Sequence, residues 1–176
     1  MNHSDHVRLL RGGVPAGGGV WADLGAGAGA FTLALADLLG PAGTIYAVDR
    51  DRRALVQGER AVRSRFPETA LHVLRADFTQ PLDLPPLDGV VMANSLHFHR
   101  AKEPILERVR GMLKRDGRLI VVEYNTERGN QWVPYPVSYP NWEALARRAG
   151  FTRTRLLGRH PSRFLREIYS AVSDNG

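Results

Sequence analysis

Three glycines, Gly25, Gly27 and Gly29, stand at alternate positions between an apolar run and a helix-like segment. Glycine permits a tight turn and lets a ligand approach the backbone closely. The free N–H groups at the start of a helix also favour a negatively charged ligand group. With Ala30 last, the same pattern fits a dinucleotide-binding turn. The loop therefore predicts a nucleotide-like ligand without choosing which one.

Three aspartates near this loop restrict which nucleotide-like ligand the chain can bind. Asp23 precedes the first glycine by two residues, where an acid suits a cationic amino group better than a pyrophosphate. Asp49 ends the next apolar run, where a carboxylate can accept from both hydroxyls of a ribose. Asp77 ends a third run and can accept from an exocyclic adenine amine, with Phe78 beside the ring. Together they fit a ligand built of amino acid, ribose and adenine.

Each aspartate also has a plainer interpretation that the sequence leaves open. Asp23 could cap the helix that follows, and Asp49 could be the N-cap of the helix beginning at Arg52. Asp77 could be a turn residue only.

The elements that must position these residues alternate between strand and helix. Helices are predicted around residues 7–10 and at 31–39, 52–66, 104–114 and 141–149. Strands are predicted at 20–24, 44–48, 70–74, 87–93, 118–124, 151–157 and 163–170. A proline-rich turn at 81–86 precedes the fourth strand, and Asp116-Gly117 is expected to turn the chain into the fifth.

This order predicts a single α/β domain with a doubly wound, mostly parallel seven-stranded sheet and a C-terminal antiparallel hairpin. In such sheets ligands bind beyond the carboxyl ends of the strands. We expect residues 1–18, which are rich in glycine, to be a flexible lead-in to a domain at 19–176.

Composition restricts the function further. The 176 residues contain no cysteine, which excludes thiolate metal sites and cysteine nucleophiles. No secretory signal or membrane-length apolar run is evident, so a cytoplasmic protein without membrane contact is expected. The net charge of +6 comes from 22 arginines and two lysines, spread along the chain. Seven of the arginines lie in the C-terminal quarter: Arg147, Arg148, Arg153, Arg155, Arg159, Arg163 and Arg166. Either a solvated surface or a phosphate-binding face would explain them.

Five motifs in order resemble the class I S-adenosylmethionine-dependent methyltransferases, in particular the small-molecule branch of the ubiquinone/menaquinone type (methyltransferase type 11/25). The resemblance covers about residues 19 to 124. Its motifs are Asp23-Leu24-Gly25-Ala26-Gly27-Ala28-Gly29, Ala47-Val48-Asp49, Ala76-Asp77-Phe78, Asp88 through His97, and Leu113 through Ile120.

The resemblance implies a Rossmann-like methyltransferase fold, S-adenosylmethionine as cofactor, and a role for each motif residue. The loop containing Gly25, Ala26, Gly27 and Gly29 passes under the cofactor. The resemblance also places Asp23 near the methionine amino group and has Asp49 with Arg50 hold the ribose. It has Asp77 and Phe78 frame the adenine, and it places Asn94 beside the reacting methyl.

Two loops supply candidates for the acceptor side. His97 could act as a general base, since imidazole titrates near neutral pH, and His99 could contact substrate. Both could instead only pack or cap locally, and two histidines without a third ligand do not predict a metal site. Aromatic residues of a proline-stiffened loop, Trp132 and Tyr135, and Tyr124 at the preceding strand end could line an acceptor pocket or pack on the domain.

The acceptor itself stays open in the sequence. A small molecule is favoured; an RNA methyltransferase, or a cofactor-binding accessory subunit without transferase activity, are the alternatives. Only about 18 residues precede the first strand, whereas many relatives place acceptor-covering helices there. The active site is therefore expected to be open or covered by a partner subunit, in a monomer or homodimer.

Overall fold

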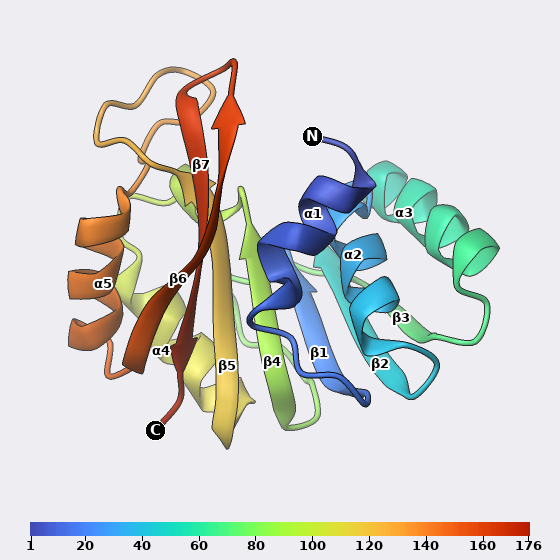
Figure 1. Ribbon diagram of the computed structural model, residues 1–176. Coiled ribbons are helices and arrows are strands. Elements are labelled where there is room, and N and C mark those ends of the chain that lie inside the picture. Colours follow the sequence, from blue (N-terminus) through green and yellow to red (C-terminus); the bar gives the residue numbers. More distant parts are fainter.

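The computed structural model describes all 176 residues as one α/β domain (Figure 1). Its helices are α1 (His3–Arg11), α2 (Ala30–Leu39), α3 (Arg52–Arg65), α4 (Glu103–Met112) and α5 (Tyr139–Arg148), with a short 3₁₀ helix η1 (Leu96–Phe98). The strands are β1 (Gly19–Leu24), β2 (Gly43–Asp49), β3 (Ala70–Arg75), β4 (Leu87–Ala93), β5 (Leu113–Tyr124), β6 (Thr152–Ser162) and β7 (Arg166–Asp174).

The seven strands form one sheet in the order β3-β2-β1-β4-β5-β7-β6. The first five are parallel, and β7 lies antiparallel between β5 and β6. The predicted mostly parallel sheet with a closing antiparallel hairpin is thus confirmed. The strand order reverses between β1 and β4, and the crevice at such a switch point is where doubly wound sheets bind ligands.

Helices cover both faces of the sheet. Buried residues of α1, α2 and α3 join one apolar cluster against the sheet, while α4 and α5 contribute to a second cluster on the opposite face. Because both faces are buried, the central strands are almost continuously apolar, as in β4 and the second half of β5. None of the helices combines the length and apolar character needed to cross a membrane.

The N-terminal segment differs from the flexible lead-in expected. Residues His3–Arg11 form α1, whose Asn2 and Asp5 make a reciprocal capping box at its start. Val7, Leu9 and Leu10 are buried in the same cluster as α2, so the helix is part of the domain. The short helix expected around residues 7–10 is present, and it is longer and better anchored than its glycine-rich surroundings indicated.

The fifth strand also differs from expectation. It begins at Leu113 rather than at 118, and Asp116-Gly117 lies inside it instead of forming a turn. Leu87 pairs with Leu113 while Gly89 pairs with Arg118, so β5 carries extra residues in a bulge. Bulges of this kind leave no alternating pattern in the sequence, which explains the wrong boundary.

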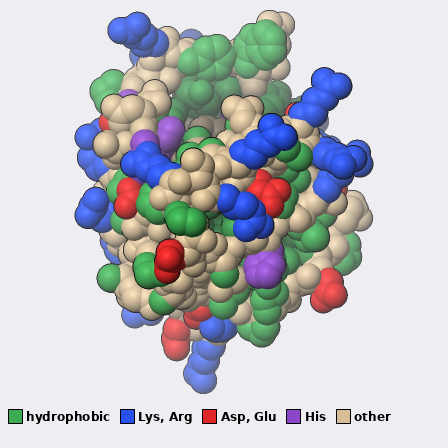
Figure 2. Space-filling model, turned by 90° about the vertical axis from the view of Figure 1, so that its right-hand side faces the viewer, with side chains coloured by type: hydrophobic (Ala, Val, Ile, Leu, Met, Phe, Trp, Pro, Cys, Tyr) green, Lys and Arg blue, Asp and Glu red, His purple; other side chains and the backbone are tan.

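The basic residues do not gather into one patch on the face that Figure 2 shows. In the view of Figure 2, arginine and lysine side chains are spread over the surface with acidic side chains among them. Several C-terminal arginines are paired within the chain: Arg148 with Glu103, Arg153 with Asp174 and Arg159 with Glu167. Three of the seven arginines in this quarter are therefore ion-paired within the chain.

Candidate active site

The glycine loop leaves β1 and enters α2 directly above the sheet. Backbone N–H groups of Gly25 and Ala26 donate to the Val48 carbonyl of β2, which fixes the loop's first turn. Gly25 has a φ of +83°, and a Cβ there would lie 2.5 Å from the Ser95 Cβ. Gly27 has a φ of +52°, and a Cβ there would point into open space. A side chain at Gly25 would therefore clash with Ser95, whereas Gly27 borders open space.

Asp49 ties this loop to the end of β2. Its Oδ2 accepts from the Gly27 N–H at 2.8 Å, and its Oδ1 accepts from the Asp51 N–H at 2.8 Å. The N-cap of α3 is Asp51, not Asp49, because Asp51 accepts from the N–H groups of Arg53 and Ala54. An ionised carboxylate has about four acceptor positions, so Asp49 keeps capacity for two further donors.

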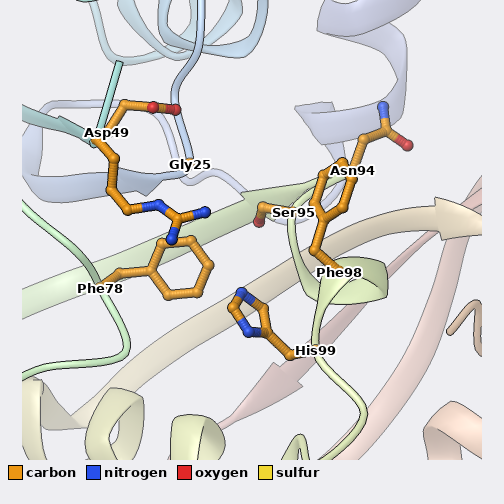
Figure 3. A pocket seen from close by; sticks show the side chains of 8 residues that line it. Gly25, Asp49, Phe78, Asn94, Ser95, Phe98 and His99 are labelled. Atoms are coloured by element: carbon orange, nitrogen blue, oxygen red, sulfur yellow. The ribbon is translucent and has the colours of Figure 1, made fainter. Parts of the chain in front are cut away.

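A cavity of about 160 Å³ opens at the switch point, beside this carboxylate. Figure 3 shows Asp49 and Phe78 on one side of it, and Asn94 and Phe98 on the other. The full lining comprises Gly25, Asp49, Arg50, Phe78, Asn94, Ser95, Phe98 and His99. Six of these were predicted as site residues, from four separate segments, and the fold brings them together.

Asn94 is the most unusual residue of this cavity. It follows β4 with a φ of +52°, in the left-handed region that asparagine enters more readily than most residues other than glycine. Its Oδ1 is buried and has no hydrogen-bond partner in the chain. A buried acceptor without a donor is costly and rare in native proteins. The unpaired oxygen therefore singles this residue out among those that line the cavity.

Asp77 lies beside the cavity but does not line it. Its Oδ1 accepts from the Thr79 N–H at 2.9 Å and the Thr79 hydroxyl at 2.7 Å, so its turn role is real. The Thr79 hydrogen bonds lower the pKa of this carboxyl, which keeps it ionised. Its Oδ2 is 3.6 Å from Arg50 Nη1. The next residue, Phe78, presents its ring to the cavity and meets the edge of His99, with ring centroids 5.3 Å apart.

Asp23 is buried below the loop rather than exposed in the cavity. Only 1% of the residue is accessible, and its Oδ2 accepts from the Thr32 hydroxyl of α2 at 2.6 Å. Burial raises the pKa of this carboxyl to about 6, partly offset by the Thr32 hydrogen bond. The contact with the first turn of α2 resembles the capping role left open by the sequence, although the N-cap of that helix is Gly29.

His97 and Glu123 form a buried pair next to the cavity. His97 Nδ1 lies 2.7 Å from Glu123 Oε2, and the two residues are 3% and 0% exposed. The other Glu123 oxygen accepts from the N–H groups of Leu96 and His97 at 3.1 and 3.2 Å. A carboxylate in this place makes Nδ1 the protonated nitrogen and leaves Nε2, which has no partner in the chain, as the acceptor.

The loop after β5 covers this pair, but two of its predicted pocket residues point elsewhere. Trp132 is 65% and Tyr135 is 42% exposed, and neither lines the cavity. The Tyr135 backbone docks the loop instead: its N–H donates to the His97 carbonyl, and its carbonyl accepts from Lys102 Nζ at 2.8 Å. Lys102 Nζ also donates to the His99 carbonyl, and burial lowers its pKa.

Several predicted residues stay outside the cavity, and others were missed. Those outside are Asp23, Ala26, Gly27, Gly29, Asp77, His97, Tyr124, Trp132 and Tyr135. Ser95 and Phe98 were missed although they stand among the predicted residues of one motif. The pairing of Glu123 with His97 was not predicted, because nothing in the local pattern ties this acid to a histidine 26 positions away.

A doubly wound sheet of this strand order, with a cavity at its switch point, is the class I methyltransferase fold. The methyltransferase domain family matches residues 22–119, which is more than half of the chain. The chain therefore belongs to that family.

Solved structures show the same fold at low sequence identity. A protein from Bordetella parapertussis is 16% identical with a TM-score of 0.77, covering 98% of this chain and 66% of that one. A SAM-dependent methyltransferase from Aquifex aeolicus is 20% identical with a TM-score of 0.75, covering 98% and 90%. The magnesium protoporphyrin IX methyltransferase of Synechocystis, solved with bound SAM, is 16% identical with a TM-score of 0.71, covering 99% and 78%.

A comparison of the sequence with curated proteins gives no match. The chain spans slightly less than two thirds of the Bordetella protein's length. At these identities the structural likeness concerns the fold.

Proposed function

We propose that this protein is an S-adenosylmethionine-dependent methyltransferase that acts on a small-molecule acceptor. The observation that carries the proposal is the cavity at the switch point. It joins the glycine loop, a carboxylate with spare acceptor capacity, an aromatic ring and an amide oxygen without a donor. A ligand made of ribose, adenine and a cationic amino acid supplies the complementary groups.

Each part of that ligand has a partner in the chain. The spare positions of Asp49, flanked by Arg50, accept from the two ribose hydroxyls, and Phe78 lies against the adenine. Asp77 Oδ2 accepts from the exocyclic amine, while its other oxygen stays on Thr79. Asn94 Oδ1 accepts from the methionine amino group. The cavity of about 160 Å³ is below the usual ligand-pocket range of roughly 300–1,000 Å³, so part of the cofactor extends along the loop above Gly27.

His97 is proposed as the general base. When bound, the cofactor supplies an electrophilic methyl group on a sulfonium sulfur. An acceptor hydroxyl that took up this methyl group would have to lose its proton as the new bond formed. The hydroxyl proton passes to His97 Nε2, and Glu123 stabilises the resulting imidazolium at Nδ1. Much of the acceleration comes from alignment of the two reactants.

The arginines favour a small-molecule acceptor over RNA, because several of them are bonded to groups of the same chain. RNA binding needs cationic groups free to neutralise phosphates. Here many are engaged within the chain, including Arg155, which donates to the Gly12 carbonyl at 2.7 Å. The Synechocystis neighbour, named for methylation of magnesium protoporphyrin IX, has the same fold.

Isothermal titration with S-adenosylhomocysteine tests the proposal. We expect one site per chain, and about tenfold weaker binding in Gly27→Ala, because the new methyl group points into the space of the cofactor. Gly40→Ala is the matched control, since Gly40 also has a positive φ of +68° with open space around it but lies at the far end of α2. Absence of binding to the unaltered protein would refute the proposal.

A further inference from the structure

A second and larger cavity lies beyond the loop that follows β5. It measures about 690 Å³, which is within the range of small-molecule sites. One wall is residues 125–128 of the loop, and the other is the tip of the β6–β7 hairpin, residues 164–166. Figure 1 shows this loop and the hairpin tip projecting together from the same end of the sheet.

A row of aromatic rings connects this cavity to the one at the switch point. Phe98, which lines the first cavity, is 4.3 Å from the His97 ring between centroids. The His97 ring is 5.9 Å from Tyr124, and Tyr124 is 5.9 Å from Phe164, which lines the second cavity. The proposed base therefore lies between the proposed cofactor site and this second space, where an acceptor has to be.

The charges of the second cavity are predominantly positive. Arg128 and Arg166 line it, and neither has an ion-pair partner in the chain, unlike Arg159 of the same hairpin, which pairs with Glu167. The acidic residue of the lining is Glu127, whose carboxylate is already hydrogen-bonded to the start of α5. Its Oε1 accepts from the Ser138 N–H at 2.9 Å, and hydrogen bonds from the start of α5 lower its pKa.

Arg166 also has a strained backbone. Its φ is +65°, a region that glycine or asparagine occupies at lower cost. The positive φ closes the turn of the β6–β7 hairpin and returns the chain into β7. Arg166 therefore lies at the hairpin tip, across the cavity from the loop that carries Arg128. Phe164 and Leu165 supply an apolar wall beside it.

We propose that this second cavity is the acceptor site and that it selects a small aromatic molecule bearing a carboxylate. Arg128 and Arg166 bind the carboxylate, and Phe164 packs against the aromatic body. The end of the acceptor that receives the methyl group extends past Tyr124 toward His97 Nε2. This inference deepens the proposed function and rests on it for the identity of the reaction.

The test compares two probes that differ in charge, 3-(4-hydroxyphenyl)propionate and its amide. Binding of each is measured by ligand-observed NMR, with and without saturating S-adenosylhomocysteine. We expect the acid to bind about tenfold more tightly than the amide, as a charge-assisted hydrogen bond predicts. Arg128→Ala and Arg166→Ala should each weaken binding of the acid about tenfold and leave the amide unchanged.

Arg163→Ala is the matched control, because Arg163 is an exposed arginine of the same hairpin tip that does not line the cavity. It should change binding of the acid less than about twofold. Equal affinity for acid and amide, no detectable binding of either, or unchanged affinity in both arginine variants would overturn the inference. The two proposals fail separately: loss of S-adenosylhomocysteine binding refutes the methyltransferase, whereas the acid and amide comparison decides the anionic site on the protein alone.

Discussion

The Asp23 carboxyl lies below the glycine loop, and burial raises its pKa to about 6 from an ordinary 3.8. Because the folded-state value is the higher one, the protonated carboxyl favours the folded protein. That contribution is complete below pH 3.8 and is lost as the pH rises through about 6. We expect Asp23→Asn, which cannot ionise, to raise the free energy of unfolding near pH 8 by up to about 3 kcal/mol.

Urea denaturation at several pH values measures this effect. The variant and the unaltered protein should converge near pH 4, where Asp23 is protonated in the folded state. A difference that does not depend on pH would show that the carboxyl is not the titrating group.

The pairing of His97 with Glu123 has a spectroscopic signature. We expect the His97 side-chain ¹⁵N shifts to show a protonated Nδ1 and an unprotonated Nε2 in the neutral ring. Glu123→Gln keeps the shape but offers an amide nitrogen in place of one acceptor, so the pattern should change and the free energy of unfolding should fall by about 1–3 kcal/mol. Glu107→Gln, at an exposed acid of α4, is the control. An unchanged tautomer in Glu123→Gln would contradict the positioning role.

The sequence could predict those site residues that follow the carboxyl ends of parallel strands. Asp49, Phe78 and Asn94 each stand at a strand end, so the rule for parallel sheets places them together. Glu123 and Phe164 could not be found in this way. Their positions depend on how β5 pairs with β7 and on the orientation of the hairpin tip, which no local pattern encodes.

At the scale of elements, α1 is expected to stabilise the whole domain. Leu10 of α1 is fully buried in the apolar cluster that α1 shares with α2. Leu10→Ala should therefore lower the free energy of unfolding by about 2–5 kcal/mol. Arg11→Ala, at an exposed position of the same helix, should change it by no more than about 0.5 kcal/mol. Thermal and urea denaturation measure both. Similar small effects in the two variants would mean that the helix is only loosely attached.

Most of the elements could be predicted because each carries its own signals. The apolar strands closed by acids and the early proline of α4 are local features, whereas Asp49 was the candidate for the N-cap of α3, which lies at Asp51. The extent of α1 and of β5 could not be predicted, because their lengths are set by packing on α2 and by the pairing of Leu87 with Leu113.

At the scale of the whole molecule, a net charge of +6 raises the question of nucleic acid. We expect tRNA to bind no more tightly than the roughly 10⁻⁴ to 10⁻⁶ M typical of non-specific contacts at physiological salt, because the arginines are dispersed and many are paired. Fluorescence anisotropy over a range of salt concentrations measures this. Much tighter binding, with a steep salt dependence, would favour the RNA methyltransferase.

The proposed function places S-adenosylmethionine in the cavity at the switch point. A crystal structure with S-adenosylhomocysteine tests it most directly. The predicted result places the ribose hydroxyls on Asp49, the adenine against Phe78 and the amino group within hydrogen-bond distance of Asn94 Oδ1. A ligand bound elsewhere, or an Asn94 Oδ1 that still has no donor with the ligand in the cavity, would contradict it.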